Sequence, residues 1–344
     1  MTKGKRSYMN NKIDFVVTWV DGNDLKWQEN FYTHQKVSGD KRISRFRDWD
    51  NLQYLFRSFE EFTPWVNKIY FVTYGHVPKW LNIHHEKLVI VKHEDYMDKN
   101  NLPVFNSHPI EINMHRIEGL SEKFVYFNDD TFILSPLKEE TFFKQDLPVN
   151  VALLGLMSNS FKDNTLSNNL SIINKHTKSS KYKIILKDFS KWLYKGYGFK
   201  LFRTMVLLPT SKFTGFKSYH QPQPFLKNTF IELWEKEEKL LTKVSKSKFR
   251  TNSEINQYLF RHWQFITGKF YPDSVKNAYK KRKFKNIRTQ EDAKMVAKHI
   301  LSGKFEMYCV NDALTDNTND FDVSKSIINN ALESLLPNKS SFEL

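Results

Sequence analysis

The sequence has very little cysteine and no long apolar run, and each absence excludes a class of protein. Among 344 residues the one cysteine is Cys309, which excludes an internal disulfide and suits a reducing compartment. No run reaches the ~18 to 20 apolar residues of a membrane span. The basic lead at residues 1–11, which we expect to be disordered, precedes an interrupted apolar run at 13–20 and no signal-peptide core. We therefore expect a soluble, cytoplasmic protein.

Acidic residues are also outnumbered, with 38 Asp and Glu against 53 Lys and Arg. The resulting net charge of +15 suits a polyanionic partner, which charge alone does not identify: nucleic acid, an anionic membrane surface or phosphorylated substrates. Hydrophobic residues make up 40% of the chain and aromatic residues 15%, so a sizeable core can form. The length allows one large domain or two ordinary ones.

Short apolar runs alternate with helical patterns in the first half of the chain. Strands are predicted at 13–20, 69–73, 88–91 and 124–127. Helical patterns lie between them, including one with an apolar face at 52–59, a short helix starting at Trp80 and Leu81, and one at 112–117. This alternation favours βα units and a mainly parallel sheet flanked by helices, that is, a Rossmann-like α/β fold.

Carboxylates follow several of the predicted strands. The strand at 124–127 ends at Asn128, Asp129 and Asp130. In open α/β sheets ligands bind beyond the carboxyl ends of strands, and two carboxylates there can hold a divalent cation that in turn holds a diphosphate. The alternative is a polar turn, because Asn and Asp are common turn formers. Asp21 and Asp24 add carboxylates after the first strand. For Asp24, a role as a helix cap explains the residue as well as a role in ligand binding does.

We divide the chain into three parts. Residues 12–156 form the nucleotide-binding α/β half, 157–212 a helical basic amphipathic insert, and 213–344 a second part that is helical with a final short strand at 307–310. The basic helix near 183–195 packs on its own domain or contacts a membrane or acceptor. Basic and aromatic residues mix at 276–288, which fits nucleic acid, a phosphate-binding patch or a solvated loop, and no nucleic-acid motif accompanies them.

Four blocks of the sequence resemble the Stealth proteins. The blocks are 13–24 (IDFVVTWVDGND), 45–136 with its Arg47-Asp48 pair, its His93-Glu94-Asp95 triplet and its Asn128-Asp129-Asp130 stretch, 220–268, and 309–312 (CVND). Stealth proteins are bacterial capsule and exopolysaccharide phosphotransferases that share blocks with the catalytic subunit of N-acetylglucosamine-1-phosphotransferase. The chain departs from the pattern at Tyr74-Gly75-His76, where an aspartate is expected before the glycine.

The resemblance implies a reaction and a metal site on a Rossmann-like, GT-A-like fold. A sugar 1-phosphate would pass from a nucleotide sugar to a hydroxyl of a saccharide or lipid-linked saccharide acceptor, and nucleoside monophosphate would leave. Asp129 and Asp130 are then expected to hold Mg²⁺ or Mn²⁺ between the two phosphates. Asp312 is a further expected metal ligand, and Asp21 and Asp312 complete the site, bind the ribose or activate the acceptor.

Other site residues follow from the same matched blocks. His220 is expected to be the general base, since an imidazole titrates near the working pH. Arg47 and Arg250 are expected to clamp phosphate oxygens, although a lone Arg is more often in a surface ion pair. Four further substrate contacts are expected at Asp24, Asn106, Asn311 and His108, of which His108 orients a substrate or only caps a helix.

Two other functions stay open at this point. A metal-dependent glycosyltransferase would use the same carboxylate pair and release nucleoside diphosphate. A nucleic-acid or membrane-binding module would explain the charge, but the carboxylate clusters repel phosphate unless a metal intervenes. We therefore expect a nucleotide-sugar donor, a saccharide acceptor and peripheral contact with the inner face of an anionic membrane, and no nucleic acid.

Overall fold

A computed structural model describes residues 12–41, 46–157, 164–177, 181–217, 220–315 and 318–344. The predicted disordered lead and Arg45, the first residue of the second block, lie outside these ranges. Within them, no helix is long and apolar enough to cross a membrane.

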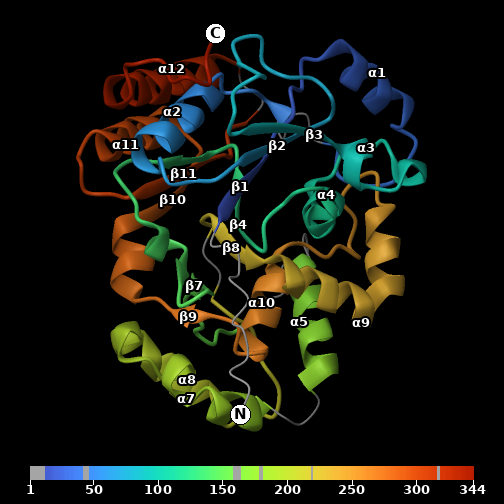
Figure 1. Ribbon diagram of the computed structural model, residues 1–344, viewed down its shortest axis with the longest axis vertical. Coiled ribbons are helices and arrows are strands. Elements are labelled where there is room, and N and C mark those ends of the chain that lie inside the picture. The colour runs from blue at the N-terminus through green and yellow to red at the C-terminus, as the bar shows by residue number, and fades with distance from the viewer. Residues whose placement is uncertain (1–11, 42–45, 158–163, 178–180, 218–219, 316–317) are drawn as a thin grey trace, which may run out of the picture.

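A five-stranded sheet forms the centre of the molecule (Figure 1). Its order is β3-β2-β1-β4-β8, and all neighbouring pairs are parallel except β4 with β8. The bounds are β1 Ile13–Thr18, β2 Ile69–Thr73, β3 Leu88–Lys92, β4 Lys123–Asn128 and β8 Gln223–Leu226. The predicted mainly parallel α/β sheet is confirmed.

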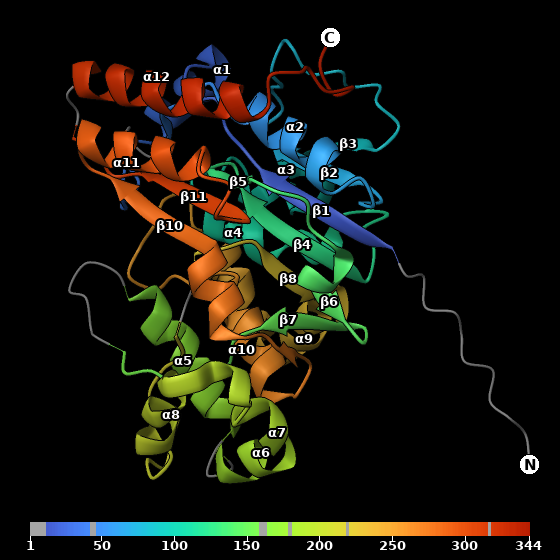
Figure 2. The ribbon, with the colours of Figure 1, turned by 90° about the vertical axis from the view of Figure 1, so that its left-hand side faces the viewer.

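Both faces of this sheet are covered, which explains why its strands are apolar without alternation. Along β1, Phe15 and Val17 face one core cluster and Val16 faces another. The first cluster is covered by α2 (Leu52–Phe62), α11 (Gln290–Ile300) and α12 (Thr318–Leu335), and the second by α4 (Ser107–Ile112), α9 (Lys227–Ser245) and α10 (Tyr258–Ile266), as Figure 2 shows. The result is a three-layer sandwich.

A second, three-stranded sheet lies against the first, in the order β10-β11-β5. β10 (Arg282–Ile287) pairs in parallel with β11 (Met307–Asp312), and β11 pairs antiparallel with β5 (Thr131–Ile133). Because β5 begins three residues after β4 ends, the turn between them joins the two sheets. A small third sheet consists of β6 (Phe143–Lys144), β7 (Leu147–Asn150) and β9 (Tyr271–Pro272).

The remaining helices lie outside this framework. α1 (Leu25–Thr33) follows β1, and the four-residue α3 (His93–Tyr96) follows β3. The end of the molecule farthest from α12 is made by α5 (Thr165–Thr177), α6 (Lys181–Lys187), α7 (Phe189–Trp192) and α8 (Leu201–Leu207) (Figure 2). Buried residues of this region, such as Ile173 and Trp192, belong to the same core cluster as α9 and α10. The three-part division of the chain stays a prediction.

Several predicted elements differ from those observed. The helix expected from Trp80 and Leu81 is wrong, because this segment is a turn whose Leu81 makes an isolated bridge to Glu343. The basic patch at 276–288 is not a loop: its second half is β10, whose residues pair with β11. The helix expected at 112–117 is wrong, because α4 already ends at Ile112 and Met114–Arg116 form only a short 3-10 turn. Strand β8 and helix α12 were not predicted at all.

Candidate active site

The junction between the two sheets carries the candidate carboxylates. Asn128 is the last residue of β4, and Asp129 and Asp130 form the turn before Thr131 opens β5. The backbone N–H of Val310 on β11 donates to the carbonyl oxygen of Asp130 at 2.8 Å. The turn is therefore held by β4 and β5, which flank it in the chain, and by the hydrogen bond from β11. It lies beyond the carboxyl end of the central strand β4, as predicted.

Negative charge accumulates at this junction. Burial, and after it the carboxylates of Asp130 and Asp48, raise the pKa of Asp129 to about 8. Burial also raises the pKa of Asp48; a hydrogen bond from the Asp50 backbone opposes this, and the charges of Asp50 and Asp21 add to it. Carboxylates that share a poorly solvated space disfavour one another's charge, and a cation among them relieves this. The donor set is therefore one that fits a hard divalent ion.

His220 lies beside the same junction. Its Nε2 accepts a hydrogen bond from the Asn128 side-chain amide at 3.1 Å, which keeps the ring's proton on Nδ1. The ring of Phe284 on β10 lies edge-on to the imidazole, with centroids 4.9 Å apart. The next residue, Gln221, donates from Nε2 to the carbonyl oxygen of Lys283 at 3.0 Å. His220 is thus held between β4 and β10, and its neighbour Phe284 is 41% exposed.

Asp130, His220 and Cys309 bring ligand atoms within 4.8 Å of one another. In the described part of the chain this is the only such group, so neither Asp129 nor Asp312 belongs to a triad that tight. Oδ1 of Asp130 accepts hydrogen bonds from Thr131 Oγ1 at 3.0 Å and from the Cys309 thiol at 3.3 Å. Burial and the charge of Asp130 raise the pKa of Cys309 well above its usual range. A protonated thiol is a hydrogen-bond donor here and a poor metal ligand.

The loop after β1 brings Asp21 to the same edge of the sheet. Its backbone N–H donates to His76 Nε2 at 2.8 Å, and its Oδ1 accepts from Asn23 N at 2.8 Å. Asp24 accepts from Trp27 N at 2.7 Å as the N-cap of α1, which is the capping role considered for it. A Cβ on Gly22 would lie 2.2 Å from the carbonyl oxygen of Phe46, so the loop packs against the segment leading to Asp48.

Asp312 and Arg47 are paired with each other. The guanidinium donates to both carboxylate oxygens, from Nε at 3.0 Å and from Nη2 at 2.9 Å. The carboxylate also accepts from Trp49 Nε1 at 3.2 Å and Leu314 N at 3.0 Å. Asn311 donates to Asn286 Oδ1 at 2.7 Å, across β10 and β11. The side chains of Arg47 and Asp312 are largely buried and bonded to each other. The roles expected for them, Asp312 as a metal ligand and Arg47 as a phosphate clamp, stay predictions.

The other predicted substrate contacts gather at the N-terminus of α4. Asn106 caps the helix by accepting from His108 N at 3.1 Å, and its amide donates to Glu254 at 2.9 Å. His108 Nδ1 lies 3.0 Å from the same Glu254 oxygen. Burial alone would raise the pKa of Glu254, but His108, Asn106 and Thr251 together lower it. Arg250 donates from Nη2 to Ser107 Oγ at 3.0 Å, which brings it to this cluster and not to Asp130.

Four residues at these sites were not among the predicted site residues. Asp48 stands next to Arg47 in a matched block, and that adjacency was the available signal. The sequence around Glu254, Phe284 and His76 does not mark them as site residues, because each contacts a site residue that is far away in the sequence. They are found only when the fold places them beside His108, His220 and Asp21.

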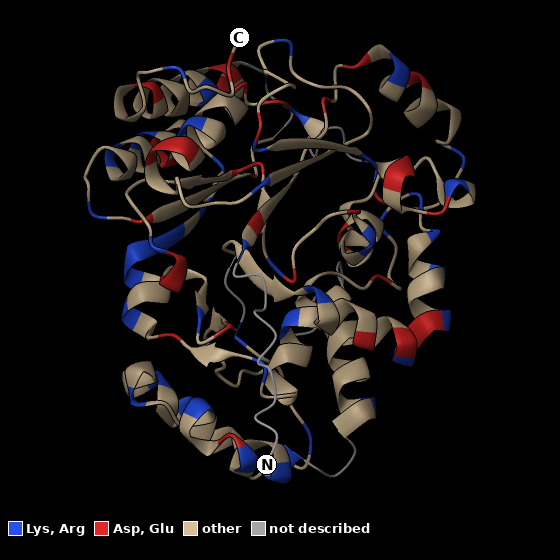
Figure 3. Ribbon diagram, in the orientation of Figure 1, with Lys and Arg blue, Asp and Glu red and all other residues tan. Residues whose placement is uncertain are grey.

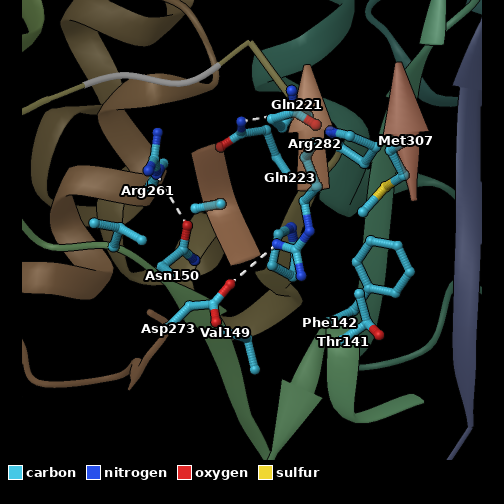
Figure 4. Close-up of a pocket in the computed structure, with 14 residues that line it drawn as sticks. Thr141, Phe142, Val149, Asn150, Gln221, Gln223, Arg261, Asp273, Arg282 and Met307 are labelled. Atoms are coloured by element: carbon cyan, nitrogen blue, oxygen red, sulfur yellow. Dashed lines mark hydrogen bonds and ion pairs between the residues drawn. The ribbon is translucent and has the colours of Figure 1, made fainter. Parts of the chain in front are cut away.

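Two cavities lie away from the carboxylates. One, of about 30 Å³, is lined by Asn150, Gln221, Arg261, Asp273 and Arg282 among others (Figure 4). The other opens nearby beside β10 and has a volume of about 300 Å³. Both lie toward the amino-terminal ends of β10 and β11, whereas the candidate site lies at the carboxyl-terminal side. Neither lining includes Asp48, Asp129, Asp130 or His220, although the smaller cavity reaches Gln221, the residue after His220.

Comparison with known proteins gives consistent matches. Residues 11–30 match Stealth protein CR1, conserved region 1, and residues 45–150 match Stealth protein CR2, conserved region 2. The chain is 39% identical over 343 residues to the capsular polysaccharide phosphotransferase WcwK of Streptococcus pneumoniae, covering 96% of this chain and 98% of that one.

Two further relatives match over nearly the full length of both chains. The receptor polysaccharide phosphotransferase WefC of Streptococcus gordonii is 38% identical, covering 98% of this chain and all of the relative. The exopolysaccharide phosphotransferase cps2G of Lactiplantibacillus plantarum is 33% identical, with 96% of each chain covered. Among solved structures, mouse xyloside xylosyltransferase 1 covers 90% of this chain and 99% of its own, at 8% identity and a TM-score of 0.32, which is too low to support an argument.

Proposed function

Because this chain belongs to the Stealth family of polysaccharide phosphotransferases, we propose that it transfers a sugar 1-phosphate from a nucleotide sugar to a hydroxyl of a saccharide acceptor. The acceptor oxygen attacks the phosphorus that bears the sugar, the bond to the nucleotide's own phosphate breaks, and nucleoside monophosphate leaves. The product is a phosphodiester linkage in a capsular polysaccharide or exopolysaccharide. The observation that supports this best is the near full-length match to named phosphotransferases.

We assign the donor's two phosphates to the junction between β4 and β5. Asp129, Asp130 and Asp48 form a negative cluster that would itself repel a diphosphate, so a divalent cation such as Mg²⁺ or Mn²⁺ is needed between them. When bound, that ion neutralises charge on the phosphoryl oxygens. The raised pKa of Asp129 supports the assignment, because a carboxylate that is costly to ionise alone gains most from a cation.

His220 is the proposed base for the acceptor hydroxyl. The lone pair of Nε2 accepts the Asn128 amide N–H in the observed arrangement, so the acceptor hydroxyl must displace this hydrogen bond before Nε2 takes its proton and the oxygen attacks phosphorus. Asn128 and Phe284 hold the ring between the two sheets. Because Asn128 immediately precedes the carboxylates, the base and the metal ligands are positioned by one continuous piece of backbone.

The other polar residues of the matched blocks are assigned to contacts with the donor and the acceptor. Asp21 lies at the end of the neighbouring strand and is suited to the donor's ribose or to the acceptor. Arg250 lies with Asn106 and His108 in a polar cluster beside Ser107, and its guanidinium is the group suited to a phosphate oxygen. Arg47 and Asp312 take part in the reaction only if the ion pair between them opens, and the Asn311 amide only if its hydrogen bond to Asn286 is released.

The partners follow from the reaction. We propose a nucleotide-sugar donor, a saccharide acceptor that is free or carried on a lipid, and a location at the cytoplasmic face of the cell membrane in contact with anionic lipid. The +15 charge suits both an anionic membrane and a growing phosphodiester polymer.

The identity of the released nucleotide tests the reaction. The protein is incubated with Mg²⁺, an acceptor oligosaccharide panel and a panel of nucleotide sugars, and the nucleotides are separated. Monophosphate release that is lost in Asp130→Ala and retained in Asp322→Ala, a matched exposed aspartate on α12, supports the proposal. Release of nucleoside diphosphate instead would make the protein a metal-dependent glycosyltransferase, the alternative that the same carboxylates allow.

A further inference from the structure

Exposed apolar side chains concentrate in one short segment of the chain. Of nineteen exposed large hydrophobic residues in the described part, seven lie between residues 182 and 206. Three of the four exposed phenylalanines are among them, and Phe199 is 91% exposed. The seven are Tyr182, Leu186, Phe189, Phe199, Phe202, Met205 and Val206. Scattered exposed apolar residues need no explanation, but a concentration of this kind marks an interaction surface.

These side chains are not left over from an incomplete core, because the same helices bury a separate set. In α8, Thr204 and Leu207 point inward, and Thr204 Oγ1 accepts from Leu154 N at 3.2 Å. Phe202 and Val206, one helical turn apart, are exposed on the other face. The ring of Phe199 is stacked with that of Phe202, with centroids 6.2 Å apart.

The surroundings of these residues are strongly basic. Residues 181–212 contain eight Lys and Arg residues and one acidic residue, Asp188, which already lies 3.5 Å from Lys191. Lys183, Lys187 and Arg203 are exposed between the apolar side chains. Helices α6, α7 and α8 form the end of the molecule opposite α12, and Figure 3 shows blue segments on them (Figures 2 and 3).

We infer that this surface, residues 182–206, inserts its aromatic side chains into a phospholipid bilayer with anionic headgroups. Apolar side chains interleaved with Lys and Arg match such a bilayer, since the rings enter the headgroup boundary while the cations stay at the phosphates. A protein partner of ordinary charge would leave the cations without counter-charges. The inference deepens the membrane contact proposed above, and rests on it, by assigning that contact to α6–α8.

The test is sedimentation of the full chain with vesicles of phosphatidylcholine, with and without phosphatidylglycerol. We expect wild-type protein to bind only the anionic vesicles, and Phe199→Ser/Phe202→Ser to bind at least about tenfold more weakly. The matched control, Met295→Ser/Leu301→Ser, removes exposed apolar side chains from the α11 region and should bind as wild type. The substitutions Lys183→Gln and Lys187→Gln should each weaken vesicle binding about fivefold. Added salt should also weaken the binding of the wild type.

Each contrary outcome overturns a different statement. If wild type does not bind anionic vesicles, the membrane contact itself is wrong. If it binds and the Phe199/Phe202 variant binds equally, the contact lies elsewhere on the chain. If light scattering shows that the wild type is a dimer and the Phe199/Phe202 variant a monomer, and the wild type does not bind vesicles, the surface is an interface between two copies of the chain. Nucleotide release with a water-soluble acceptor, measured on every variant, separates these results from failure of the proposed reaction.

Discussion

The pair between Arg47 and Asp312 provides the sharpest test of which carboxylates hold the cation. Asp312 was expected to be a metal ligand, yet its carboxylate accepts four hydrogen bonds from Arg47, Trp49 and Leu314. The side chains of Arg47 and Asp312 are only 16% and 15% exposed. We therefore expect Asp312→Ala to act on folding stability first.

The size of the effect follows from the geometry. Removing one partner of a buried ion pair costs roughly 3 to 5 kcal/mol, and we take the lower end because both groups retain some solvent. Asp312→Ala should thus lower the free energy of unfolding by about 3 kcal/mol in a urea titration. Arg47→Ala should cost a similar amount, and the double variant clearly less than the sum, since the two share one interaction.

A different result would refute this reasoning. If Asp312→Ala unfolds within about 1 kcal/mol of wild type but needs far more Mg²⁺ for nucleotide release, Asp312 is a metal ligand and the ion pair opens in the working enzyme. Additivity of the two single variants would show that Arg47 and Asp312 do not stabilise each other in the folded protein. The Mg²⁺ titration should therefore be run on both single variants beside the unfolding experiment.

Three further predictions concern other parts of the site. Glu254→Gln should destabilise the protein at neutral pH. Because folding lowers the pKa of Glu254, its carboxylate stabilises the folded protein above the unfolded-state pKa of about 4.3, and this stabilisation is lost as the pH falls through the folded-state pKa. Urea titrations of the variant and the wild type should therefore give the same free energy of unfolding in acid. Gly22→Ala should reduce nucleotide release sharply, because its Cβ would lie 2.2 Å from the Phe46 carbonyl oxygen, whereas Gly155→Ala, with neighbours at 3.5 Å, should be tolerated; equal activities would contradict the packing argument. Asp48→Asn should raise the Mg²⁺ concentration for half-maximal nucleotide release at least severalfold, and an unchanged requirement would remove Asp48 from the site.

The four parallel strands of the central sheet were predictable because their signal is local, whereas the antiparallel edge strand β8 was missed. Strands such as 124–127 are buried on both faces, so each reads as an apolar run that stops at polar residues. The position of the carboxylates beyond a strand end follows from the same pattern and was predicted correctly. β10 was missed since Arg282–Ile287 is an edge strand with half its side chains basic, which in sequence resembles a solvated loop.

The hydrogen bonds and ion pairs that hold the site residues in place could not be predicted, since they join residues that are distant in the sequence. Arg47 and Asp312 are 265 residues apart, and Asn106 and Glu254 are 148 apart. No periodicity or spacing encodes such pairs, and each member taken alone resembles an ordinary surface residue. The matched family blocks identified most of the polar residues involved, but not which of them neutralise one another.

The turn that links the two sheets also constrains how this protein can vary. Thr131 lies opposite Cys309 in the ladder between β5 and β11, and Asn128 lies opposite Thr18 in the ladder between β4 and β1. Since side chains alternate along a strand, one additional residue between these two ladders would reverse the facing of β5 or break its pairing. Insertions and deletions should therefore be excluded from residues 128–131 even where individual substitutions are tolerated, and a library of single-residue insertions would show a gap there.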